Sequence, residues 1–409
     1  MSVRRCFNIE DLRQEARRKL PAPIFHYLDG GADDELTLRS NTRDFDRYAL
    51  QPSALSDVSD ISLKTKLLGV ELDLPLLLSP TGMSRLFHHG KELAAARAAH
   101  QFGALYSLST MATTSLEDVA NSSNGPKMFQ VYIFRDRGLT RELVQRCKEA
   151  NYDALCLTVD TPVAGNRERD RRTGFVMPPK LTLKSLLSFV ASPAWSWHFL
   201  LDPNFSLANV AHRVDALSRM GALGVIEYVN SQFDRSVTWK DAEWLASEWG
   251  RPFVIKGLSR PDDARQAAGI GAKAVMISNH GGRQLDSALS PVECLAPIRD
   301  AVGDSLELIV DGGIRRGTHV LKALALGANA CSIGRPYLYG LAAGGQAGVE
   351  HALRLLQDEL TRGMALLGCR TLKELGRDRV QQLSHQELKD MRGVRVQQNV
   401  DWVVDATAN

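Results

Sequence analysis

The sequence predicts an α/β protein built on one (β/α)8 TIM barrel, and two observations lead to that prediction. Short apolar runs alternate with amphipathic stretches along the chain, which is the pattern of parallel strands connected by helices. The chain has 409 residues, of which 44% are hydrophobic, and this is enough for one large barrel. We expect a single domain over 1–409, with an N-terminal helical segment (1–73), a barrel (74–370) carrying a long insertion after strand 4 (about 171–238), and a C-terminal segment (371–409).

Eight apolar runs have the length and composition of buried strands. In chain order they are Leu74–Ser79, Ala104–Ser109, Met128–Tyr132, Ala154–Val159, Phe253–Lys256, Ala274–Ser278, Glu307–Asp311 and Ala330–Gly334. The amphipathic segments between them predict helices, among them Glu92–Phe102, Arg141–Ala150, Pro261–Gly269 and Gly317–Leu326. Eight strands are the number that this type of barrel needs.

Charge and cysteine content exclude several classes of function. Fifty Lys and Arg against 47 Asp and Glu leave a net charge of +3, and we see no basic stripe, so we expect no nucleic-acid partner. The six cysteines are dispersed and lack the spacing of metal ligands, so we expect no metal and reduced thiols. The N-terminus lacks the apolar core of a secretory signal, which makes the cytoplasm the expected compartment.

Polar and reactive residues gather at the carboxyl ends of the predicted strands. In strand order they are Pro80–Met83; Ser109 and Thr110; Gln130 and Tyr132; Thr158 and Asp160; Lys256; Ser278 and His280; Asp311–Gly313; and Gly334 and Arg335. The carboxyl ends of barrel strands meet at one rim, which is where TIM-barrel enzymes carry their active sites. Residues with purely structural roles would be scattered over both ends, so this accumulation predicts an active site.

The run SNHGGRQLD, Ser278–Asp286, is the most informative part of that rim. His280 can accept a proton near neutral pH, and Arg283 can bind a carboxylate through two parallel hydrogen bonds. Gly281 and Gly282 allow a sharp bend and close approach to a ligand. The structural alternative is an ordinary loop with a satisfied histidine and a surface arginine. Its position after the sixth strand favours chemistry on a small acid.

The last two strand ends have the composition of a phosphate site. TIM barrels often bind phosphate with the loops after strands seven and eight, and DGGIRRG (Asp311–Gly317) and Ile333–Arg335 follow those strands. Glycine exposes backbone N–H groups, and Arg315 or Arg335 would neutralise the phosphate charge. The alternative is that Gly312 and Gly313 only form a tight turn.

Lys256 ends the fifth strand in a crowded rim, where an unpaired ammonium group would be costly to bury. It therefore needs a negative partner. An anionic reduced cofactor would supply one, and pairing with Asp160 or Asp311 is the structural alternative. A Schiff-base role for the amine is a competing chemical interpretation.

Taken in order, these motifs resemble the FMN-dependent L-2-hydroxy acid dehydrogenase/oxidase family, and bacterial (S)-mandelate and L-lactate dehydrogenases resemble the chain most. The resemblance covers almost the whole chain and is carried by Phe25–Asn41, Pro80–Met83, Phe129–Tyr132, Thr158–Asp170, Val254–Gly257, Ser278–Asp286, Asp311–Gly317 and Gly334–Arg335. It implies FMN as the cofactor and oxidation of an L-2-hydroxy acid to the 2-oxo acid.

The resemblance also implies a role for each site residue. His280 would be the base, oriented by Asp160, and Arg283 with Tyr132 would hold the substrate carboxylate. Tyr27 would complete that cradle, Arg167 would add positive charge, and Lys256 would stabilise the reduced flavin at its N1–C2=O edge. The remaining cofactor contacts would come from Pro80, Thr81 and Gly82 on the N5 side, from Ser109, Gln130, Thr158 and Ser278, and, at the ribityl phosphate, from Asp311, Gly313, Arg315, Gly334 and Arg335. Loss of the substrate α-hydrogen as a proton and as a hydride both stay open.

The resemblance implies the substrate and the electron acceptor less specifically than it implies the cofactor. The segments 163–170, 175–181 and 288–291 resemble those of enzymes acting on mandelate, and Met111 would leave more room for a bulky acid than the tryptophan of plant glycolate oxidases. Gly82, where many oxidases of the family carry alanine, favours transfer of electrons to a quinone or another external acceptor. The alternatives are an L-lactate dehydrogenase, an oxygen-using oxidase and a non-catalytic FMN-binding scaffold. Family analogy implies a homotetramer.

The predicted insertion contains an apolar stretch, 181–201, in which Ser185–Leu201 carries no charged residue and includes Trp195 and Trp197. This pattern favours shallow insertion into a membrane interface, which would place the protein peripherally on the inner face of the cell membrane. The stretch is short for a spanning helix, and Pro193 would interrupt one. A lid or a subunit contact that buries the same side chains is the alternative.

Overall fold

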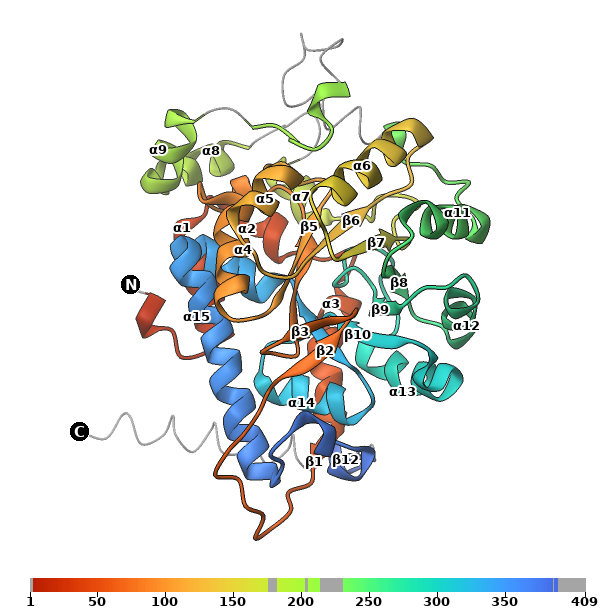
Figure 1. Ribbon diagram of the computed structural model, residues 1–409. Helices are drawn as coiled ribbons and strands as arrows, with labels where there is room; N and C mark the ends of the chain where they lie inside the picture. Colours follow the sequence, from red (N-terminus) through yellow and green to blue (C-terminus); the bar gives the residue numbers. More distant parts are fainter. Residues whose placement is uncertain (1–2, 176–181, 203–204, 214–230, 385, 389–409) are drawn as a thin grey trace, which may run out of the picture.

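The computed structural model describes residues 3–175, 182–202, 205–213, 231–384 and 386–388, and its centre is a closed barrel of eight parallel strands (Figure 1). The strands are β4 (Leu76–Thr81), β5 (Leu105–Ser109), β6 (Lys127–Val131), β7 (Ala154–Thr158), β8 (Phe253–Leu258), β9 (Ala274–Ser278), β10 (Glu307–Asp311) and β11 (Ala330–Ile333). Pairing of β11 with β4 closes the barrel. All eight predicted strands and the (β/α)8 fold are confirmed.

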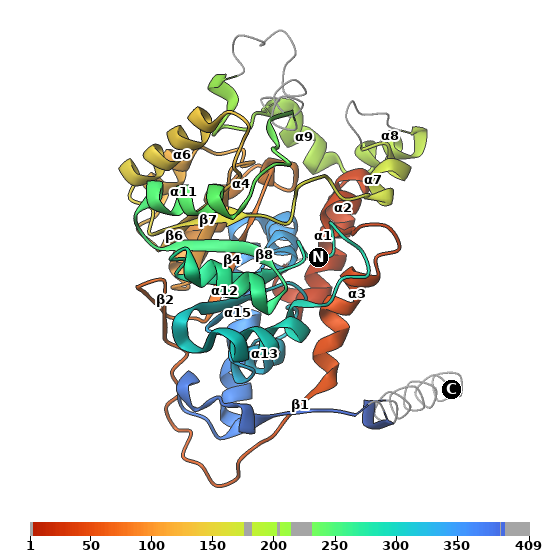
Figure 2. The ribbon, with the colours of Figure 1, turned by 90° about the vertical axis from the view of Figure 1, so that its right-hand side faces the viewer.

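Helices surround the barrel and connect its strands (Figures 1 and 2). They are α4 (Lys91–Gln101), α5 (Leu116–Ser122), α6 (Arg137–Glu149), α11 (Trp239–Trp249), α12 (Pro261–Gly269), α13 (Pro291–Val302), α14 (Gly317–Ala325) and α15 (Arg335–Leu367). The four helices named from the sequence correspond to α4, α6, α12 and α14. Helix α6 begins one turn earlier than predicted because the Asp136 side chain accepts a hydrogen bond from the Leu139 N–H and caps it.

The N-terminal segment contains helices α1 (Ile9–Lys19), α2 (Ala22–Asp29) and α3 (Leu36–Arg43). It also contributes strands that the sequence did not predict, namely β1 (Tyr48–Leu50), β2 (Thr65–Leu67) and β3 (Val70–Leu72). Strand β1 pairs with β12 (Val380–Gln382) and joins this segment to the C-terminal one.

The β2–β3 hairpin closes the base of the barrel. Its Leu67, Leu68 and Leu72 are buried in one cluster with inward-facing barrel residues such as Leu77 and Met276. The Leu68 N–H also donates to the Glu307 carboxylate at 2.8 Å, at the start of β10. Because the hairpin covers this end with apolar side chains, the polar opening of the barrel lies at the other end.

The insertion after β7 is built of short helices. They are α7 (Glu168–Thr173), α8 (Leu183–Val190) and α9 (Pro193–Leu201), and Pro193 opens α9 at a position where its missing N–H costs nothing. Helix α8 lies beside α2 (Figure 2), where the Ala22 N–H donates to the Ser188 hydroxyl at 3.1 Å. Within the described ranges, no helix combines the length and apolarity needed to cross a bilayer. The parts 176–181, 203–204 and 214–230 of the predicted insertion, and 389–409 of the C-terminal segment, lie outside the described residues.

Candidate active site

A cavity of about 840 Å³ opens at the carboxyl ends of the barrel strands. It is lined by most of the residues that the sequence singled out: Tyr27, Pro80, Thr81, Gly82, Ser109, Tyr132, Arg167, Lys256, His280, Arg283, Asp311, Gly313, Arg315, Gly334 and Arg335. The other four, Gln130, Thr158, Asp160 and Ser278, lie directly behind this lining and bond or pair with it. The structure therefore brings the whole predicted set together.

Lys256 and Asp311 form a buried ion pair across the ends of β8 and β10, with Nζ and Oδ2 3.1 Å apart. Ser278, on β9 between them, accepts a hydrogen bond from Lys256 at 3.1 Å and donates one to Asp311 at 2.8 Å. Burial alone would lower the pKa of Lys256, but Asp311 and Asp160 raise it above its usual value. Lys256 is therefore an ammonium group, which disfavours a Schiff-base role because a protonated amine is not a nucleophile.

His280, which follows β9, is paired with a carboxylate that follows β7, two strands away in the barrel. Its Nδ1 lies 2.9 Å from Oδ1 of Asp160. Burial would raise the pKa of Asp160, but His280 and Lys256 lower it below its usual value, so the carboxyl group is ionised. A carboxylate beside Nδ1 favours the tautomer with hydrogen on that atom, which leaves the lone pair of Nε2 free to accept a proton.

The backbone of His280 is held in an unfavourable conformation. Its φ of 57° lies in the left-handed region, which costs energy for a residue with a side chain. The Ser278 hydroxyl accepts a hydrogen bond from the His280 N–H at 3.0 Å, and Gly281 and Gly282 continue the turn at positive φ. The turn that displays the imidazole is therefore tied to the same serine that bridges the ion pair.

Two guanidinium groups flank Tyr27 at the cavity wall. The Cζ of Arg283 lies 5.0 Å from the centre of the Tyr27 ring, and that of Arg167 lies 5.4 Å from it. Burial and the nearby Arg167 lower the pKa of Arg283 to about 10. Arg167 is paired with the Asp170 carboxylate, whose Oδ2 lies 3.2 Å from its Nε, whereas the planar fork of Arg283 can bind a further carboxylate.

Tyr132 also lines the cavity, and its ring meets that of Phe233 edge-on, with the ring centres 4.9 Å apart. Burial, and then Asp160, raise the pKa of its hydroxyl, so Tyr132 stays protonated and can donate a hydrogen bond to a bound anion.

The residues present also fit a flavin nucleotide. Among the described side chains, Gln130 Nε2 is buried without a hydrogen-bond partner, while its Oε1 accepts from Ser109 at 3.0 Å. A buried amide N–H without an acceptor is costly, and the carbonyl of a bound ring would satisfy it. At the other end of the cavity, Gly334 precedes the N-terminus of α15, a position that attracts phosphate.

Several site residues had not been predicted. The hydroxyls of Ser79 and Ser332 lie 2.5 Å apart, and Ser79 donates to Asp311 Oδ1 at 2.6 Å, so they complete the hydrogen bonds around the ion pair. Both are hydroxyl residues near the end of a barrel strand, which is the signal that could have identified them. Phe87, Phe175 and Phe233, which line the cavity from connections outside the strands, have no comparable local signal.

Comparisons with known proteins agree with this site. The family model described as "FMN-dependent dehydrogenase" matches residues 16–382. An L-lactate oxidase of Nostoc sp. is 46% identical over 372 residues, covering 90% of this chain and 96% of that protein. An L-lactate dehydrogenase of Vibrio cholerae is 41% identical over 369 residues, covering 90% and 97%.

Solved structures give the same assignment. A crystal structure of the monotopic membrane protein (S)-mandelate dehydrogenase has a TM-score of 0.89 and 37% identity, covering 92% of this chain and all of that one. A mandelate oxidase with benzoyl-formic acid has a TM-score of 0.78 and 35% identity, covering 92% and 98%. The chain therefore belongs to the FMN-dependent dehydrogenase family and is an FMN-dependent oxidoreductase of L-2-hydroxy acids.

Proposed function

We propose that the chain oxidises an aromatic L-2-hydroxy acid of the (S)-mandelate type to its 2-oxo acid, and that the electrons pass to a quinone or another external acceptor. The observation that carries this proposal is one cavity in which a carboxylate-bound histidine, an arginine fork and a buried ammonium group converge. Such a site provides a base, a binding group for the substrate carboxylate and a stabiliser of negative charge on a reduced ring.

In the proposed reaction, Arg283 and Tyr132 bind the substrate carboxylate, Tyr27 completes its cradle and Arg167 adds positive charge. Nε2 of His280 takes a proton from the substrate, and Asp160 stabilises the resulting imidazolium. Bound FMN supplies the two-electron acceptor. These roles are supported by the 2.9 Å contact of His280 with Asp160 and by the stacking of both arginines on Tyr27.

The proposed cofactor contacts fall into two groups, one for the flavin ring and one for the ribityl chain and phosphate. Lys256 would lie beside the N1–C2=O edge of the ring, because that is where negative charge accumulates on reduction. The ring would be held by Pro80, Thr81 and Gly82 on the N5 side and by Ser109, Gln130, Thr158 and Ser278. The ribityl chain and phosphate would be held by Asp311, Gly313, Arg315, Gly334 and Arg335.

A bulky side chain on the substrate is supported by the apolar part of the cavity. Phe87, Met111, Phe175 and Phe233 line it, and none of them offers a hydrogen bond that a small polar acid would need. L-Lactate is the second candidate, favoured by the two curated relatives that carry that substrate in their names.

The structure gives Gly82 a packing role in addition to its proposed meaning for the acceptor. A Cβ atom at this position would lie 2.7 Å from Cβ of Met111 and 3.1 Å from its carbonyl oxygen, so an alanine would require Met111 to move. Packing against Met111 is therefore a sufficient reason for glycine at this position. The proposal of an external acceptor rests more on the surface formed by α8 and α9.

That surface is a stripe of exposed apolar side chains, spaced by three and four residues on each helix. It consists of Leu183, Leu186, Leu187 and Val190 on α8, which are 50–77% exposed, and Trp197, Leu200 and Leu201 on α9, which are 61–71% exposed. A lid over the cavity would bury these side chains against the barrel, whereas here they are exposed. This supports attachment to a membrane surface, proposed to be the inner face of the cell membrane.

Other faces of the same helices hold the stripe in place. The indole N–H of Trp195 donates to the Leu86 carbonyl at 2.7 Å, and the buried Arg85 donates to the carbonyls of His198 and Asp202, each at 2.8 Å. The apolar surface is thus presented by a fixed platform. A membrane bound to this platform would contain the lipid-soluble quinone that is proposed as the acceptor. For the oligomeric state, we propose a homotetramer by analogy with the family.

Anaerobic mixing of the FMN-loaded enzyme with candidate acids tests the proposed reaction. We expect (S)-mandelate to bleach the flavin absorbance faster than L-lactate, and (R)-mandelate to leave it unchanged, because the clamp and the base fix one orientation of the substrate. Bleaching by no acid would instead support a non-catalytic FMN-binding scaffold. Reoxidation should be faster with a soluble quinone than with oxygen, and stoichiometric peroxide would show an oxygen-using oxidase.

His280→Asn tests the proposed base. Asparagine tolerates the left-handed backbone of this position, so the fold and the FMN content should be retained. We expect kcat to fall by at least about a hundredfold, since a positioned general base contributes on that order. The matched control is His351→Asn on α15, whose ring bonds the Cys6 carbonyl remote from the cavity. Wild-type kcat in the His280 variant would show that another group is the base.

The double variant Leu187→Gln/Leu200→Gln tests membrane attachment. Two exposed leucines at about 1.5 kcal/mol each correspond to a roughly hundredfold weaker binding to phospholipid vesicles, measured by co-sedimentation. Turnover should be unchanged. The control is Leu55→Gln/Leu366→Gln, which replaces two exposed leucines outside the stripe. Equal losses in both variants, or none in either, would contradict the assignment, and a change of oligomeric state without one of vesicle binding would indicate a subunit contact.

A further inference from the structure

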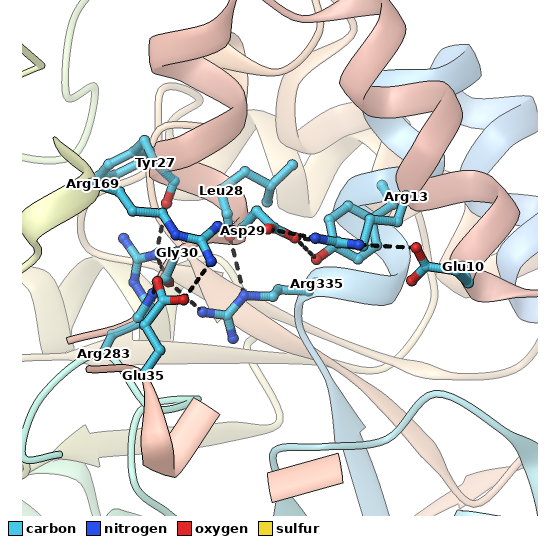
Figure 3. A network of polar contacts seen from close by, with 12 residues as sticks. Glu10, Arg13, Tyr27, Leu28, Asp29, Gly30, Glu35, Arg169, Arg283 and Arg335 are labelled. Carbon is cyan, nitrogen blue, oxygen red and sulfur yellow. Dashed lines mark hydrogen bonds and ion pairs between the residues drawn. The ribbon is translucent and has the colours of Figure 1, made fainter. Parts of the chain in front are cut away.

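The backbone carbonyl groups at the end of α2 contact two arginines that line the active-site cavity (Figure 3). The carbonyls of Tyr27 and Gly30 accept hydrogen bonds from Nη1 of Arg283, at 2.7 and 3.1 Å. The carbonyls of Leu28 and Gly30 accept from Nε and Nη2 of Arg335, at 3.2 and 2.7 Å. The final carbonyls of a helix lack partners within it and carry partial negative charge, which suits guanidinium groups. One short stretch of backbone therefore accepts hydrogen bonds from both arginines, and Arg335 makes one further hydrogen bond, from Nη1 to the Gly281 carbonyl at 2.8 Å.

Asp29 fixes this turn from its other side (Figure 3). Its carboxylate, in a residue only 5% exposed, accepts two hydrogen bonds from Arg13 on α1, at 2.6 and 2.9 Å. It accepts a third from Arg169 on α7 at 3.0 Å and a fourth from the Tyr339 hydroxyl on α15 at 2.7 Å. Three elements distant in sequence thus meet on one carboxylate, between the residues whose carbonyls hold the arginines.

The charge of Asp29 is stable in this environment. Burial would raise the pKa of its carboxyl group, but the hydrogen bonds from Arg13 and Tyr339 lower it below the usual range. Paired, hydrogen-bonded carboxylates are the buried charges that proteins tolerate. Removing the charge would leave Arg13 and Arg169 without their shared partner, and the turn would lose its attachment to α1 and α7.

Arg169 also ties down the backbone that follows α2, through Glu35. Arg169 also bonds the Glu35 carboxylate, and Glu35 Oε1 accepts a hydrogen bond from the Gly31 N–H at 2.9 Å. At Gly30, an added Cβ would lie 2.8 Å from the His26 carbonyl and 3.3 Å from the Arg169 side chain, so the turn has no room to shift toward them. Asp29 itself does not line the cavity, unlike its neighbours Tyr27 and Leu28.

We propose that Asp29 is a positioning residue that sets the guanidinium groups of Arg283 and Arg335, and through them the affinities for the substrate carboxylate and the cofactor phosphate. The proposal rests on the functions proposed above for these two arginines. Because one turn holds both, a disturbance of Asp29 should weaken the two binding steps together. The proton-transfer pair, His280 and Asp160, does not contact Asp29 and should be unaffected.

Asp29→Asn tests this directly, because it removes the charge and keeps the shape. Two quantities are measured: the Kd of the apoprotein for FMN and for riboflavin by quenching of flavin fluorescence, and KM and kcat at saturating FMN. We expect the Kd for FMN and the KM each to rise about tenfold or more, since small displacements of a binding group have effects of that size. The Kd for riboflavin, which lacks the phosphate, and kcat should change little.

Glu117→Gln is the matched control. Glu117 and Arg146 form the same two-bond contact, at 2.7 and 2.9 Å, between α5 and α6, and neither residue lines the cavity. This variant should lower Tm without changing KM or the Kd for FMN. If Asp29→Asn behaves like the control, Asp29 is only a brace of the N-terminal helices and the proposal is wrong.

If Asp29→Asn does not fold, Arg13→Gln provides a second test of the same proposal. The Arg13 side chain is 35% exposed, and its loss leaves Asp29 with Arg169 and Tyr339, so the same shifts should appear at smaller size. Unchanged KM and Kd in this variant would overturn the proposal. A wild type that binds FMN more tightly than riboflavin but oxidises no 2-hydroxy acid would contradict the proposed function, and the FMN measurements would still decide the role of Asp29.

Discussion

The ion pair between Lys256 and Asp311, buried at the mouth of the barrel, is the interaction on which the rest of the site depends. Charges at this depth persist only when their hydrogen bonds are complete, and here the serines of three strands complete them. One of these, Ser278, also binds the backbone N–H of His280 and so supports the strained turn that displays the imidazole. His280, its partner Asp160 and the ammonium group of Lys256 therefore form one electrostatic unit.

A second layer, outside the barrel, holds the two arginines that are proposed to bind anions. Lys256, Asp311, Asp160 and His280 lie at the strand ends and interact with one another. Arg283 and Arg335 are instead held by backbone carbonyls at the end of α2, which belongs to the N-terminal segment. Under the proposed roles, this division separates the chemistry from the recognition of substrate and phosphate. The N-terminal helices would then serve the active site in addition to burying apolar surface. The α8–α9 platform, which contacts α2, lies beside this second layer (Figure 2).

The barrel strands and the position of most site residues could be predicted from the sequence, because short local patterns encode both. Apolar runs located all eight strands, and the residues at or shortly after their carboxyl ends include Lys256, His280 and Arg283. Contacts between distant segments were not predictable in this way: nothing near Asp29 indicates that Arg13, Arg169 and Tyr339 converge on it, and β1 and β12 pair across most of the chain. Gly82 illustrates a further limit, since its packing against Met111 appears only in three dimensions.

The buried ammonium group of Lys256 is proposed to stabilise the negative charge of reduced FMN, and the midpoint potential of the bound flavin tests this role most directly. Replacing Lys256 with methionine should shift that potential to more negative values by about 30 mV or more, which corresponds to about 1.4 kcal/mol for a two-electron couple. Lys256→Arg, which keeps the charge, should remain close to the wild type. An unchanged potential in the methionine variant would contradict the account.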